Sequence, residues 1–131
     1  MKIIIPLAPI TKKNSQRIFV NSTTGKPFIA PSAKFKGYQH AAGYYLNPNN
    51  GVDNYPVNIK CLFYMPTKRR CDLTNLLEAI DDVLTHYGII SDDDYLHIGG
   101  HDGSRVYYDK NNPRTEIYIT PLESAGASDK I

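Results

Sequence analysis

Apolar residues in the middle of the chain recur with the spacing of an amphipathic helix. The positions are Leu73, Leu76, Leu77, Ile80 and Leu84, which fall on one helical face. Gly88 follows them, and a glycine just past the last apolar residue favours a helix end because it adopts a left-handed backbone without strain. The pattern therefore predicts a helix that packs one stripe of side chains against a core.

A two-residue alternation before this helix predicts the longest strand. Its apolar positions are Val57, Ile59, Cys61, Phe63 and Met65. Because successive side chains of a strand point to opposite faces, these five residues share one face. We expect this strand to lie at the centre of a sheet and to end at Pro66.

Shorter segments on both sides complete the predicted fold. An edge strand is expected within residues 1–10, and a helix from about Pro31 to Leu46. The segments Ile18–Val20 and Pro27–Ile29 flank a turn with Gly25 and predict a projecting hairpin. Further strands are expected at Tyr95–Ile98, Arg105–Tyr108 and Thr115–Thr120.

This order of elements predicts a single α+β domain over residues 1–122, with a mixed or antiparallel sheet and two main helices on one face. Residues 123–131 are expected to form a disordered tail. The two cysteines lack histidine partners at zinc-finger spacing, and the N-terminal apolar run is too short for a signal peptide or a membrane span. We therefore expect a cytoplasmic protein with no membrane partner.

Charge is distributed unevenly along the chain, although the net charge of the 131 residues is only +2. Residues 1–52 contain seven Lys or Arg and no acidic residue, whereas the remainder contains eight basic and thirteen acidic residues. The asymmetry favours an anionic partner for the first part and cations for the second. Chance, with a solvated surface, is the alternative.

Carboxylates lie at both ends of the predicted central helix. Asp72 precedes it, and residues 92–94, all aspartates, follow its end. A helix of about fourteen residues rises about 20 Å, so Asp72 and Asp93 can meet only if a return strand runs back beside it. A buried carboxylate cluster is costly without a cation, and a divalent metal with oxygen ligands is the common remedy. Lys68, Arg69 and Arg70 come just before Asp72 and can hold phosphates, which indicates phosphodiester chemistry.

These acidic residues also have explanations that need no catalysis. Asp72 can simply cap the helix, and a run of aspartates can be a solvated turn. Asp81 and Asp82, near the middle of the helix, are expected to form a wet surface. His101 and Asp102 lie where an Asp-Gly pair favours a tight turn.

A second basic segment follows the first strand. Lys12, Lys13 and Arg17 lie there among small hydrogen-bonding residues, as in a loop that contacts a phosphate backbone. An ordinary surface loop has a similar composition, so both interpretations stay open.

The segment from Met65 to Tyr95 resembles the RusA-type Holliday-junction resolvases. The resemblance is carried by the basic run, by the Asp-Leu-Thr-Asn-Leu start of the helix, and by the Asp-Asp pair after Gly88. It spans most of the chain but is sharp only in this segment. In that family three aspartates gather magnesium, and their positions correspond here to Asp72, Thr74 and Asp93. Such proteins also have a basic, asparagine-containing loop after the first strand.

The resemblance implies a Mg²⁺-dependent, structure-selective endodeoxyribonuclease that resolves four-way DNA junctions by paired nicks, in recombination and repair. Mn²⁺ is the alternative ion. Asp72 and Asp93 would be catalytic metal ligands and Asp92 a further ligand, while the two basic segments would bind DNA. Paired cuts by a domain with one site imply a homodimer. A phage or prophage origin is also implied.

Two positions depart from the family pattern. Thr74 stands where an aspartate is expected, and Glu78 where a lysine is expected. Thr74 itself, Asn75 and Asp102 are the residues that could compensate for the missing carboxylate or support the ligands. A non-catalytic or weakly catalytic junction-binding protein of the same fold is therefore the first alternative. A metal-dependent phosphohydrolase of small phosphoesters, suggested by the Asp-x-Thr sequence at 72–74, is the second.

Overall fold

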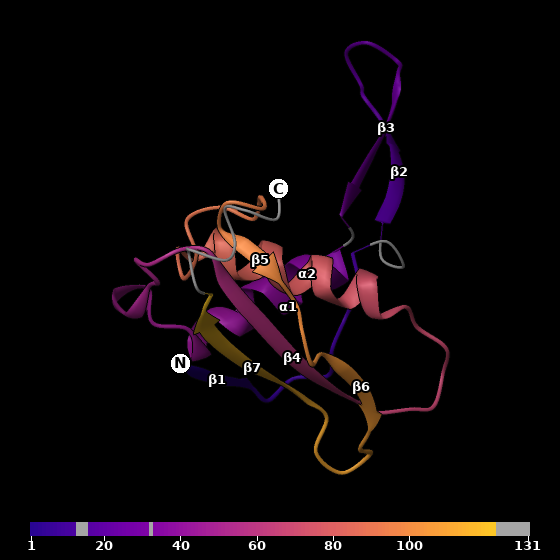
Figure 1. The fold of residues 1–131 in the computed structure, drawn as a ribbon. Coiled ribbons are helices and arrows are strands. Elements are labelled where there is room, and N and C mark those ends of the chain that lie inside the picture. The colour runs from indigo at the N-terminus through magenta and orange to yellow at the C-terminus, as the bar shows by residue number, and fades with distance from the viewer. Residues whose placement is uncertain (13–15, 32, 123–131) are drawn as a thin grey trace.

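The longest strand, β4 (Val57–Met65), lies inside a five-stranded sheet (Figure 1). It pairs antiparallel with β7 (Arg114–Pro121), which pairs antiparallel with β1 (Lys2–Ile5) at the edge. On its other side β4 pairs in parallel with β5 (Ile98–Gly100) near its start and with β6 (Arg105–Tyr108) near its end. The structure is a computed structural model that describes residues 1–12, 16–31 and 33–122.

Both main helices pack on the same face of this sheet. The residues of β4 that alternate into the core, from Val57 to Phe63, are almost fully buried together with apolar residues of α1 (Ala33–Ala42) and α2 (Leu73–His86). The intervening residues of β4 are only half-buried. The protein is therefore a single α+β domain with a mixed sheet and two main helices, as the sequence predicts. None of the described elements covers the second face of the sheet (Figure 1).

Helix α2 ends as its sequence predicts. Tyr87 occupies the C-cap, and Gly88 has a φ of 72°, in the left-handed region. The backbone N–H of Ile89 then donates to the carbonyl of Leu84 at 2.9 Å. Ile89 and Ile90 are buried, so the chain leaves the helix through the core before it reaches the aspartate run.

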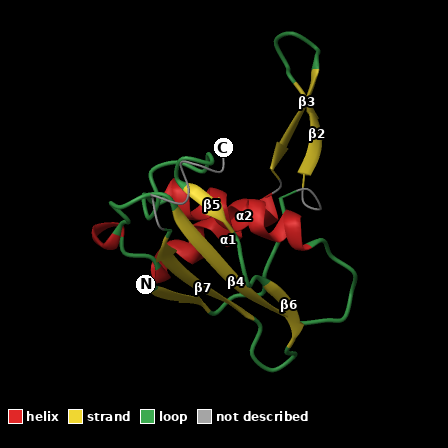
Figure 2. Cartoon of the chain, viewed as in Figure 1, coloured by secondary structure: helices red, strands yellow, loops and turns green. Residues whose placement is uncertain are grey.

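The predicted hairpin forms a small sheet of its own. Strands β2 (Gln16–Val20) and β3 (Pro27–Pro31) pair antiparallel and extend away from the rest of the molecule (Figures 1 and 2). Asn21 holds the turn by accepting hydrogen bonds from the backbone N–H groups of Thr23 and Thr24, at 2.8 and 3.0 Å. Gly25 has a φ of 70°.

The bounds of two elements, the first helix and β5, differ most from those predicted. The first helix ends at Ala42 and continues as two short 3₁₀ helices, η2 (Gly43–Tyr45) and η3 (Pro48–Asn50). The strand predicted at Tyr95–Ile98 is wrong for its first three residues, because β5 begins only at Ile98. The Asp94 carbonyl instead accepts hydrogen bonds from the N–H groups of His97 and Ile98, at 3.0 and 2.9 Å, and winds this segment into a turn.

In the part of the chain that the structure describes, every helix is too short or too polar to cross a membrane. The predicted tail, residues 123–131, and Lys13 lie outside the described residues.

Candidate functional site

An exposed basic loop leads from β4 into α2. Lys68, Arg69 and Arg70 are all exposed, and none of the three forms an ion pair with a described residue. The Lys68 ammonium lies over the ring of Tyr108 at 5.1 Å from its centroid. The loop therefore presents three cations to solvent just before the start of α2.

Asp72 occupies the N-cap position of α2 but does not cap the helix. Its side chain accepts no hydrogen bond from the first helical amides. Among the described residues, its side chain accepts one hydrogen bond, from Asn75 Nδ2 to Oδ2 at 3.3 Å. The carboxylate is exposed and sits at the positive end of the helix dipole, where a negative charge is favoured. Simple capping does not explain this residue, which stays available to a ligand.

The aspartate run lies beyond the other end of α2. The Tyr55 hydroxyl accepts a hydrogen bond from the backbone N–H of Ser91 at 2.9 Å, and the rings of Tyr55 and His97 are 4.7 Å apart. These two contacts of Tyr55 hold the segment with the three aspartates next to the residues just before β4. Asp92 Oδ1 accepts from the backbone N–H of Asp93 at 2.7 Å.

Asp92, Asp94 and His97 bring one potential ligand atom each to within 4.8 Å of one another. Asp94 Oδ1 and His97 Nδ1 are 2.6 Å apart, and this contact with His97 lowers the pKa of the Asp94 carboxyl. Among the described residues this is the single group of three such side chains. Its one imidazole and two carboxylates differ from the all-aspartate set that the family resemblance implies.

One chain does not bring Asp72 and Asp93 together. Asp72 precedes α2, whereas Asp93 follows it. The fourteen residues of α2 advance about 20 Å along the helix axis. The expected return strand does exist, as β5 and β6, but Asp93 comes before it begins. Within one chain, Asp72 and Asp93 thus lie beyond opposite ends of α2.

Asp81 and His101 form a half-buried pair. Asp81 Oδ2 and His101 Nε2 are 2.9 Å apart, and His101 Nδ1 lies 2.8 Å from the carbonyl oxygen of Ile59. The Asp81 side chain is only 14% exposed, so its prediction as a wet surface is wrong. Its second oxygen, Oδ1, is buried and accepts no hydrogen bond from a described residue.

Burial and mutual contact shift the pKa of both members of this pair. Burial raises the pKa of Asp81, the contact with His101 opposes this, and the charges of Asp93 and Asp82 raise it further. Burial by itself would lower the pKa of His101, but the Asp81 carboxylate and the Ile59 carbonyl raise it above its usual value. The imidazolium form of His101 is therefore favoured beside an ionised Asp81.

One cation of the basic loop after β1, Lys12, contacts other residues of the same chain. The Lys12 ammonium forms an ion pair with Asp82 and lies over the ring of Phe35 at 5.8 Å. Lys12 thus joins the loop to α2. Arg17 lies on β2, in the projecting hairpin.

Of the three residues that could compensate for the missing carboxylate or support the ligands, two lie at the start of α2 and one lies elsewhere. Thr74 is exposed in the first turn of α2, and Asn75 contacts Asp72. Asp102 lies elsewhere, because its backbone N–H donates to Asn58 Oδ1 at 2.8 Å and the Asn58 amide donates to its carbonyl at 3.1 Å. Asn75 is thus the one of the three that contacts a predicted ligand.

Comparison with known proteins adds no further assignment: the chain matches no protein-family model, and it matches no curated protein.

Proposed function

We propose that this protein is a Mg²⁺-dependent endodeoxyribonuclease that acts on branched DNA such as a four-way junction. The observation that carries the proposal is the start of α2, where an exposed, non-capping Asp72 follows three exposed cations with only Cys71 between them. None of the three cations forms an ion pair with a described residue. Carboxylates that hold a metal and cations that hold phosphates are the two components that phosphodiester cleavage needs. The resemblance to RusA-type resolvases supports the same chemistry.

Each residue has a separate task in this proposal. Lys68, Arg69 and Arg70 bind the phosphates on either side of the cleaved bond. Asn75 orients Asp72 through its hydrogen bond. A divalent ion bound by Asp72 and Asp93 would supply an activated water and would stabilise the leaving oxygen.

The proposal requires two copies of the chain. Asp72 and Asp93 lie beyond opposite ends of the fourteen-residue helix α2, so a site that uses both takes Asp72 from one protomer and Asp93 from its partner. A symmetric dimer would contain two such sites. This arrangement suits a junction, whose resolution needs one cut in each of two strands.

The test is incubation of the purified protein with a synthetic four-way junction and with linear duplex of matched sequence, each with Mg²⁺ or with a chelator. We expect paired nicks in the junction, dependent on Mg²⁺, and little cleavage of the linear duplex. Replacing Arg69 and Arg70 with Ala should weaken junction binding and reduce the slope of log affinity against log salt by roughly 0.9 per lost phosphate contact. An unchanged slope would place the DNA on another surface.

A junction-binding protein without cleavage activity is the second candidate. Thr74 and Glu78 favour it, because both depart from the pattern of the family that the chain resembles and both are exposed at the start of α2. Threonine can bind a hard cation but contributes no negative charge. Junction-selective binding without nicking, at any Mg²⁺ or Mn²⁺ concentration, would favour this candidate over the nuclease.

A further inference from the structure

The sheet face opposite the helices carries three tyrosines and is covered by no described element (Figure 1). The tyrosines are Tyr64 on β4, Tyr107 on β6 and Tyr118 on β7. A solvent-facing sheet surface is normally polar, so aromatic rings on it call for an explanation. Tyr107 remains 46% exposed even though its ring stacks on that of Tyr64.

The strand register arranges these rings in rows with cations. Tyr118 lies opposite Lys2 on one side and Lys60 on the other, and their ammonium groups are 5.5 and 4.6 Å from its ring centroid. In a parallel row, Tyr64 lies between Arg114 and Tyr107. Its ring centroid is 5.3 Å from that of Tyr107 and 3.7 Å from Arg114 Cζ. The rows are four strand residues apart, or about 13 Å.

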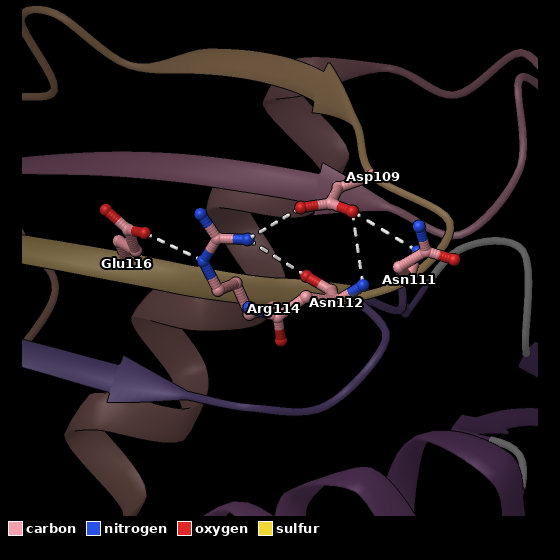
Figure 3. A network of polar contacts seen from close by, with 5 residues as sticks. All are labelled: Asp109, Asn111, Asn112, Arg114 and Glu116. Atoms are coloured by element: carbon pink, nitrogen blue, oxygen red, sulfur yellow. Dashed lines mark hydrogen bonds and ion pairs between the residues drawn. The ribbon is translucent and has the colours of Figure 1, made fainter.

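Arg114 is held in place by its own ion pairs (Figure 3). Its guanidinium donates to Glu116 at 2.8 Å and to Asp109 at 3.1 Å, and it also donates to the carbonyl of Asn112 at 3.0 Å. The contact with Arg114 lowers the pKa of Glu116, which also accepts a hydrogen bond from the Tyr118 hydroxyl at 2.9 Å. The Glu116 carboxylate is thus paired with Arg114. The same guanidinium, held by these contacts, lies against the Tyr64 ring of the Tyr64–Tyr107 stack.

The face carries three further cations. Lys2, Lys60 and Arg105 form no ion pair with a described residue. Arg105 continues the row between the two tyrosine rows, because it lies opposite Leu62 on β4. The open face therefore combines an exposed ring, Tyr107, and a half-exposed ring, Tyr118, with three cations that form no ion pair with a described residue.

We propose that this open sheet face binds single-stranded DNA, with bases stacked on Tyr107 and Tyr118 and with phosphates near Lys2, Lys60 and Arg105. Unpaired bases offer π faces that a duplex hides, and aromatic side chains with nearby cations are the usual means of binding them. A second copy of the chain fits less well, because a symmetric contact would bring the same cations face to face. The choice of DNA as the ligand rests on the proposed function. The arrangement of rings and cations on this face is independent of that proposal.

The test is the fluorescence anisotropy of a labelled oligo-dT of about ten nucleotides, a length within the usual site size of a small domain. A chelator is present throughout, so cleavage plays no part. We expect Tyr107→Ala to weaken binding about tenfold, as loss of one base stack does, while Tyr107→Phe binds like the wild type. Lys60→Gln should lower the salt slope by about 0.7. The matched control is Tyr44→Ala, an 80% exposed tyrosine on η2, which should leave binding unchanged.

Three outcomes would overturn the inference. The wild type could fail to bind oligo-dT, Tyr107→Ala could bind as well as Tyr107→Phe, or the Tyr107→Ala variant could convert a dimer to a monomer in sedimentation. The last result would identify the face as a contact between copies. Junction cleavage is measured separately: a chain that cleaves junctions but does not bind oligo-dT overturns this inference alone, and the reverse overturns only the nuclease proposal.

Discussion

His101 is the residue whose role is hardest to foresee from the sequence. In a regular strand, side chains alternate from Ile98, which faces the core, so His101 would point away from it. The register between β4 and β5 shifts, however: Val57 pairs with Ile98 but Asn58 pairs with Gly100, which leaves Gly99 as an extra residue. This irregularity turns His101 inward to Asp81 and Asp102 outward to Asn58. A tight turn accounts for the Asp-Gly pair at residues 102 and 103. It gives no indication that the preceding His101 points into the protein.

The His101–Asp81 pair makes stability depend on pH in a defined direction. The pKa of His101 is raised in the folded state above its unfolded value of about 6.5. At a pH below about 6.5, His101 is protonated in both the folded and the unfolded state, and the pair stabilises the fold in full. As pH rises through the folded pKa, the native state loses a proton that the unfolded state has already released, and the stabilisation is lost, with a slope of at most about 1.4 kcal/mol per pH unit.

We predict that His101→Gln removes this decline between pH 6 and pH 9. The measurement is urea unfolding of wild type and variant across that range. His40→Gln is the matched control, because His40 is exposed and forms no ion pair with a described residue, and it should retain the wild-type profile. Parallel profiles for wild type and His101→Gln would show that the pair does not titrate in this way.

The bounds of some secondary-structure elements follow from the periodicity of their apolar residues, whereas those of others depend on local hydrogen bonds. Strand β4 and helix α2 are each long and one-sided, so their bounds follow closely from the positions of Val57–Met65 and of the leucines in α2. Residues 95–97 are rich in apolar and aromatic side chains, which predicts a strand. They form a turn because Asp94 bonds to the backbone of residues 96–98. Such local hydrogen bonds, one to the Asp94 side chain and two to its carbonyl, override a short hydrophobic pattern.

The end of α2 can be tested through Gly88. Its φ of 72° costs a residue with a Cβ about 1 kcal/mol, and no atom lies within 4 Å of an added Cβ, so the effect is purely one of backbone conformation. We predict that Gly88→Ala lowers the free energy of unfolding by about 1 kcal/mol. Gly37→Ala is the control: Gly37 lies within α1, also in open space and without a positive φ, so that change should stabilise the protein by about 0.5–1 kcal/mol. Equal effects of both changes would contradict the predicted role of Gly88.

At the scale of the whole molecule, the sequence predicts the α+β fold but not how the acidic residues are grouped. The motif places Asp72 and Asp93 in one family pattern, whereas the fold places them beyond opposite ends of α2. Sequence spacing cannot show where the chain leaves a helix, and here it passes through buried Ile89 and Ile90 before the aspartates. The open sheet face is likewise assembled from separate parts of the chain: β1 near its start, β4 in its middle, and β6 and β7 towards its end.

The central claim is that a cleavage site takes Asp72 from one protomer and Asp93 from its partner. Asp72→Asn and Asp93→Asn should each abolish Mg²⁺-dependent nicking of a four-way junction while leaving junction binding intact, because each removes a charge but keeps the shape of the side chain. Mixing the two inactive variants, with unfolding and refolding to exchange protomers, tests the claim directly. In a mixed dimer one site loses both aspartates and the other keeps both. We predict that nicking returns, one strand per junction, in the mixture alone. A mixture that forms mixed dimers and binds junctions but stays inactive would contradict the two-chain site.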